Sequence, residues 1–134
     1  MAVNKAYSTY QANSIITAKP EELTLMLYNG ILRFISQAQK NINGKNIPAA
    51  HEDIVKAQDI IMELVASLDH KYEIAGNLLQ LYSYMHRQLI EANVKKDQQI
   101  LAEVHKLVTE LRDTWAQAMK IAKEQASSPQ TVSK

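Results

Sequence analysis

Three segments of this 134-residue chain place apolar residues at spacings that alternate between three and four. They are residues 47–68, 75–92 and 101–122. This spacing lines one face of an α-helix and is typical of long helices that pack against one another in bundles. The pattern therefore predicts three long amphipathic helices that share one core.

A fourth helix is expected between Pro20 and Ile42, before these three. Pro20 suits a first helical turn, and Glu21 and Glu22 follow where negative charge is favourable. The apolar residues that come next lie on more than one face of the helix: Leu23, Met26 and Leu27 on one, and Leu25 and Tyr28 on another. A helix in a small bundle needs one apolar stripe. The second face must meet a neighbour, another segment of the chain or a partner.

Short connections separate the expected helices. Asn43 and Gly44 form a good stop after the first helix, and Asn46 and Asp97 are plausible N-caps for the second and fourth. Helices joined in this way pack as antiparallel neighbours. The fold class that follows is all-α: an antiparallel up-down-up-down four-helix bundle with a partly ordered N-terminal segment.

The domain division follows from the same pattern. Residues 19–125 form the bundle, residues 1–18 form an N-terminal segment without sustained periodicity, and residues 126–134 form a disordered tail. Trp115, the only Trp, continues the series through Val108 and Leu111. These three side chains are expected in the core.

Composition excludes several classes of function. The chain has no Cys, so disulfides and thiolate chemistry are absent. The net charge of +1 gives no electrostatic reason to expect nucleic acid as a partner. No segment has the apolar run of a signal peptide or of the ~20-residue membrane span, so we expect no membrane insertion and a cytoplasmic protein.

No constellation for catalysis or metal binding is visible in the sequence. A di-metal site in a helical bundle needs Glu-x-x-His pairs, and this chain has none. The four histidines are scattered singly, and His70 and Glu73 form only one reversed pair. No Gly-rich phosphate loop or nucleophile motif occurs. We therefore expect a protein that is not an enzyme and has no cofactor.

Several helices carry further apolar residues beside the main stripe. In the last helix these are Ile100, Leu107 and Ile121, spaced seven and fourteen residues apart. One interpretation is a broad core-facing side, which is common in globular helices. The other is an apolar groove that receives an amphipathic helix from a partner.

Four stretches of the chain carry a resemblance to a known family. They are Ala6–Ser14, Pro20–Gly30, Leu81–Asn93 and Leu111–Ala118. With them the chain resembles the flagellin-specific secretion chaperones of the FliS family. Pro20–Gly30 contains the family signature Leu-x-Leu-Met-Leu-Tyr-(Asp/Asn)-Gly, and all four stretches occur in the expected order over nearly the whole chain.

The resemblance implies a cytoplasmic export chaperone. Such a protein binds the C-terminal segment of flagellin, prevents premature polymerisation and delivers flagellin to components of the flagellar type III export gate. The candidate partner-binding residues are Tyr7, Tyr10, Gln11, Leu25, Tyr28, Ile100, Leu107 and Ile121. Residues 1–18 either cover part of the groove in the free protein or only fix the entry of the first helix.

An alternative function uses the same groove for another client. The chain would then be an adaptor or regulator that binds a flagellar anti-sigma factor or a translational regulator. Co-purification with full-length and C-terminally truncated flagellin distinguishes the two hypotheses.

Overall fold

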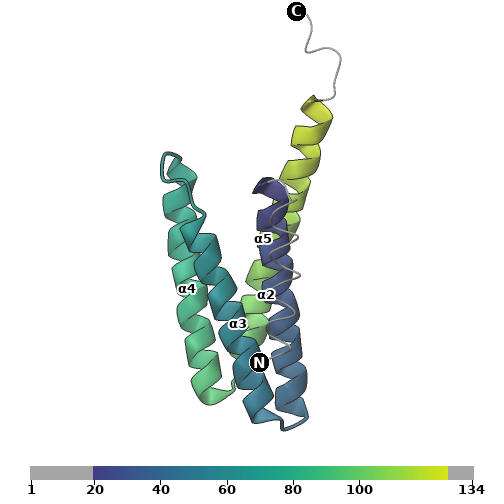
Figure 1. The fold of residues 1–134 in the computed structure, drawn as a ribbon, viewed down its shortest axis with the longest axis vertical. Coiled ribbons are helices and arrows are strands. Elements are labelled where there is room, and N and C mark those ends of the chain that lie inside the picture. Colours follow the sequence, from purple (N-terminus) through teal and green to yellow (C-terminus); the bar gives the residue numbers. More distant parts are fainter. Residues whose placement is uncertain (1–19, 127–134) are drawn as a thin grey trace, which may run out of the picture.

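The computed structural model describes residues 20–126, which form four α-helices. They are α2 (Pro20–Asn43), α3 (Ile47–Ala66), α4 (Glu73–Lys95) and α5 (Gln98–Ala126). Successive helices run in opposite directions (Figure 1), and α5 returns to pack on α2. The all-α bundle predicted from the sequence is therefore confirmed, with each helix at its expected place.

The two N-caps predicted from the sequence are present. The Asn46 Oδ1 accepts a hydrogen bond from the Ala49 N–H at 3.3 Å, at the start of α3. The Asp97 Oδ1 accepts from the Gln99 and Ile100 N–H groups at 2.8 and 3.2 Å, at the start of α5. Each cap satisfies helix N–H groups that have no partner within the helix.

The end of α2 differs in one detail from the expectation, and the end of α4 is built in the same way. α2 stops at Asn43 as predicted, but the residue in the left-handed conformation is Lys45 (φ 60°) rather than Gly44. Lys96 (φ 50°) plays the same part after α4. In both cases the next N–H bonds to a carbonyl five residues earlier, at 2.8 and 3.0 Å. These bonds close the helix ends and offset the cost of a left-handed lysine, on the order of 1–2 kcal/mol.

The core runs along the bundle axis where the apolar stripes meet. It is built mainly from aliphatic side chains, with two tyrosines, one phenylalanine and one methionine among them. The largest side chains with almost no exposed surface are Tyr28, Ile31, Ile35, Ile54, Ile61, Leu64, Tyr82, Met85, Leu89, Leu101, Val104 and Val108. Every helix contributes, so one core holds the described residues together.

The second half of α5 does not follow its predicted stripe into the core. Val108 is buried as expected, but Leu111 and Trp115 are only half-buried, and Ala118 and Ala122 are exposed. The reason is the position of α5 relative to α2. The Trp115 indole reaches the carbonyl of Glu21, the second residue of α2, so the later turns of α5 pass beyond the start of that helix (Figure 1).

Candidate partner-binding site

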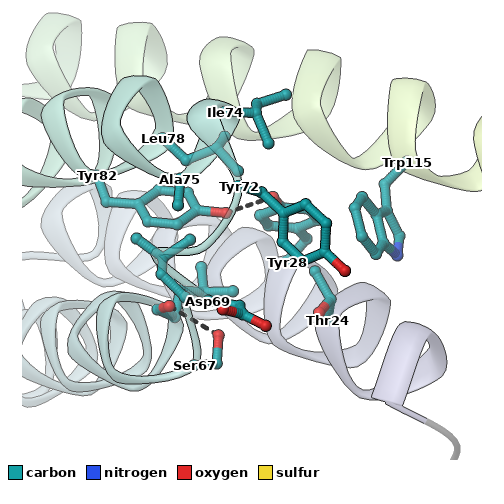
Figure 2. A pocket seen from close by; sticks show the side chains of 12 residues that line it. Thr24, Tyr28, Ser67, Asp69, Tyr72, Ile74, Ala75, Leu78, Tyr82 and Trp115 are labelled. Atoms are coloured by element: carbon teal, nitrogen blue, oxygen red, sulfur yellow. Dashed lines mark hydrogen bonds between the residues drawn. The ribbon is translucent and has the colours of Figure 1, made fainter.

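A pocket opens at the end of the bundle where α2 begins and α3 ends, and we name it the open-end pocket. Its volume is about 190 Å³, and side chains from all four helices line it. In Figure 2, residues from α4 and from the loop after α3 lie on one side, and Trp115 of α5 lies on the other. The lining residues are Thr24, Tyr28, Leu64, Ser67, Leu68, Asp69, Tyr72, Ile74, Ala75, Leu78, Tyr82 and Trp115.

Two tyrosine hydroxyls meet in the lining of this pocket. The hydroxyls of Tyr28 on α2 and Tyr82 on α4 are 2.6 Å apart, and each residue is 2% exposed. The bond joins diagonally opposite helices, and the rings lie 6.5 Å apart at 60°. Burial raises the pKa of both hydroxyls, and for Tyr82 the bond to Tyr28 raises it further. Both groups are therefore protonated at neutral pH.

The loop between α3 and α4 forms one rim of the pocket. Asp69 holds this loop in a turn because its Oδ1 accepts from the Lys71 N–H at 3.1 Å. Tyr72 precedes α4 without a side-chain cap and is largely exposed, as is Ile74 in the first turn. The rim thus combines a carboxylate with large apolar side chains in contact with water.

Trp115 ties α5 to the first turn of α2. Its Nε1–H donates to the Glu21 carbonyl at 2.8 Å, and the ring packs against the core. The sequence placed Trp115 in the core, and this prediction was wrong because α2 begins opposite Trp115, so the indole lies at the end of the bundle. The indole instead forms a wall of the pocket.

A shallower depression lies on α5 next to Trp115, and we name it the α5 hollow. It is lined by Asp113, Thr114, Gln117, Ala118 and Ile121, which recur at helical spacing on one side of α5. Ile121 is 44% exposed there. The open-end pocket and the α5 hollow therefore use neighbouring turns of one helix.

The structure brings together only part of the predicted set of partner-binding residues. Tyr28 lines the open-end pocket and Ile121 lines the α5 hollow. Leu25 is half-buried on α2 and lines neither. Ile100 and Leu107 are half-buried and pack against the core, which supports a broad packing face for the first half of α5. Tyr7, Tyr10 and Gln11 lie outside the described residues.

The sequence interpretation missed the partner of Tyr28 and the role of the loop. A signal for the first was present, because Tyr82 stands on the predicted apolar stripe and a buried tyrosine hydroxyl needs a hydrogen-bonding partner. No such signal in the sequence pointed to Asp69 and Tyr72. Their place on the rim of the open-end pocket depends on how far the α3–α4 pair diverges from the α2–α5 pair.

Within residues 20–126, no group of three or more His, Asp or Glu side chains could hold a metal ion. Over the same residues, each helix is too short or too polar to cross a lipid bilayer. The distinctive features of this region are apolar hollows, which suit binding of another protein.

Comparisons with known proteins agree with this interpretation. A family model described as flagellar protein FliS matches residues 3–122. The flagellar secretion chaperone FliS of Bacillus subtilis (strain 168) is 45% identical over 119 residues, covering 89% of this chain and 90% of the relative. The corresponding protein of Salmonella typhimurium is 35% identical over 84% of this chain and 87% of its own length. Flagellar secretion chaperone FliSB of Pseudomonas aeruginosa is 37% identical, covering 86% of this chain and 96% of that protein.

Proposed function

Because this chain belongs to the FliS family of flagellar secretion chaperones, we propose that it binds the C-terminal segment of flagellin in the cytoplasm. Binding keeps flagellin from polymerising before export and presents it to the flagellar type III export apparatus. The protein acts by binding alone and needs no cofactor.

The open-end pocket is the observation that carries this proposal. A client segment that folds on binding loses conformational entropy and needs a large apolar contact to offset that loss. The pocket between the four helices offers one part of this contact, and the exposed Ile74 and Ile121 extend the apolar surface on α4 and α5. An amphipathic client helix, with apolar side chains at spacings of three and four residues, can place one of them in the pocket and others along this surface.

Calorimetric titration with the flagellin C-terminal segment of the same organism tests the proposal. Ile121→Glu places a charge in the α5 hollow and should weaken binding at least tenfold, about 1.4 kcal/mol. The matched control is Val94→Glu on α4, because Val94 is 78% exposed and lies at the other end of the bundle. Equal affinity of both variants and the wild type would locate the client elsewhere.

Co-purification separates this function from the alternative client. Full-length flagellin should be retained by the chain, and flagellin without its C-terminal segment should be lost. Retention of an anti-sigma factor or a translational regulator, with no flagellin bound, would favour the adaptor function.

We also propose that residues 1–18 cover part of the client surface in the free protein. Their tyrosines and the Ile15-Ile16 pair supply apolar groups, two of them with a polar tip. A chain that begins at residue 19 should remain helical and change its affinity for the flagellin segment. Loss of helicity on truncation would make the segment structural.

A further inference from the structure

The hydroxyl pair in the open-end pocket has one hydrogen more than its internal bond uses. Two protonated hydroxyls carry two hydrogens, and the bond between Tyr28 and Tyr82 uses one. Among residues 20–126 no other group accepts a hydrogen bond from either hydroxyl. Within the described residues, the second hydrogen of this buried pair therefore has no acceptor other than what enters the pocket.

The other small hydroxyls in the lining are already occupied. The Ser67 Oγ donates to the Leu64 carbonyl at 2.7 Å, and the Thr24 Oγ1 donates to the Pro20 carbonyl at 3.4 Å. Tyr72 is mostly exposed, so its hydroxyl has water as a partner. The tyrosine pair is thus the buried donor that a bound side chain meets, and leaving it unmatched costs about 1–3 kcal/mol.

The size and charge of the pocket narrow the choice of that side chain. A cavity of about 150 Å³ lined by apolar side chains is large enough for one benzene molecule. The open-end pocket, at about 190 Å³, therefore has room for one large side chain with a polar tip. The walls from Leu64, Leu68 and Leu78 require an apolar stem.

A negatively charged tip is disfavoured for two reasons. Asp69 places a carboxylate in the lining, and its contact with Lys71 is a long one of 3.8 Å between largely exposed groups. An exposed ion pair of this kind neutralises little. A buried carboxylate would in addition lose its hydration.

We infer that the Tyr28–Tyr82 pair selects a client side chain that has an apolar stem and ends in a neutral amide, glutamine or asparagine. The amide oxygen accepts the hydrogen that the pair does not use. This inference rests on the proposed function, because it names the anchor residue of the flagellin segment. The tyrosine pair thereby determines which register of the client segment is bound.

A probe of the pocket tests this chemistry without the client. Benzamide combines a ring of suitable size with a neutral amide, and benzoate replaces the amide by a carboxylate. Trp115 is the only Trp in the chain and lines the pocket, so its indole N–H resonance reports binding at one place. The full-length chain should bind benzamide saturably and benzoate at least tenfold more weakly.

Removal of the two tyrosine hydroxyls should abolish the preference for benzamide over benzoate. In Tyr28→Phe/Tyr82→Phe both partners become apolar with little change of shape, which a folded protein tolerates well. This variant should bind benzamide at least fivefold more weakly than the wild type. Tyr84→Phe is the matched control, because the Tyr84 hydroxyl bonds Glu103 and does not line the pocket.

Three results would overturn the inference. They are equal benzamide affinity in the wild type and the double variant, benzoate binding as tight as benzamide binding, and a wild type that does not bind benzamide. The benzoate comparison needs no variant and holds even if the double variant fails to fold. A flagellin segment that does not bind in calorimetry, with the benzamide results as expected, would contradict only the proposed function.

Discussion

The two ends of the bundle are built in different ways. At the end formed by the 43–47 and 95–98 connections, both helix starts are capped by side chains and both helix ends close with backbone hydrogen bonds. At the other end, α4 starts at Tyr72 without a side-chain cap, and the loop of residues 67–72 borders a pocket. We call the first the closed end and the second the open end.

Polar contacts join the helices at both ends, but they differ in kind. At the closed end, Asn41 donates to Asp53 at 2.7 Å, and the Gln98 amide donates to the Gln39 carbonyl at 3.1 Å. At the open end, the hydroxyl pair uses only half of its hydrogens internally. The comparison suggests that one end holds the bundle together and leaves the other end free to bind.

The largest expected effect lies at the closed end. Leu101 is fully buried in the first turn of α5, so Leu101→Ala should lower the free energy of unfolding by about 2–5 kcal/mol. Urea unfolding followed by circular dichroism measures this loss. A loss below about 1 kcal/mol would contradict the assignment of stability to this end.

Trp115→Ala should lower the free energy of unfolding by less than Leu101→Ala does, although Trp is the larger side chain. The indole is half-buried and makes one hydrogen bond to the α2 backbone. We expect a loss of roughly 2 kcal/mol, below the 3–5 kcal/mol typical of a fully buried aromatic side chain. Urea unfolding of both variants on the same day gives the ranking, and a greater loss for Trp115→Ala would reverse the comparison.

The Asp97 cap should contribute a smaller amount to the free energy of unfolding. Asp97→Ala removes the acceptor for two N–H groups at the start of α5 and should cost about 1 kcal/mol. Asp97→Asn keeps an acceptor at this position and serves as the control. Equal stability of the Ala and Asn variants would show that the cap adds nothing.

Removing the two buried tyrosine hydroxyls should have the smallest effect on stability at neutral pH. Its effect should appear at alkaline pH and is specific to the open end. Burial raises the folded-state pKa of Tyr28 and Tyr82 above the usual 10.0, so the unfolded chain loses these protons first. The stability that the pair contributes is complete below pH 10 and is lost as the pH rises through the raised values. Tyr28→Phe/Tyr82→Phe should therefore match the wild type within about 1 kcal/mol at pH 7 and lose less stability above pH 10.

Thermal unfolding at several pH values measures this difference. Tyr72→Phe is the control, since it removes a tyrosine hydroxyl from a largely exposed side chain. Parallel loss of stability in the wild type and the double variant above pH 10 would exclude the pair as its source.

Local chemistry made the closed end predictable from the sequence. The caps at Asn46 and Asp97 act within three residues, and the alternating apolar spacing defines the helix faces that meet there. The structure of the open end depends on the angle between the α3–α4 pair and the α2–α5 pair, and on where α2 begins beside α5. Trp115 continues the stripe in sequence and yet leaves the core, because α2 begins opposite it.

The division between a packing end and a binding end can be tested directly by amide hydrogen exchange, with and without the flagellin C-terminal segment. Exchange reports local opening along the whole chain. Binding should slow exchange in residues 67–78 and 111–121, which border the open-end pocket and the α5 hollow, and leave residues 44–54 and 92–101 nearly unchanged. Protection that concentrates in residues 44–54 and 92–101 would contradict the account.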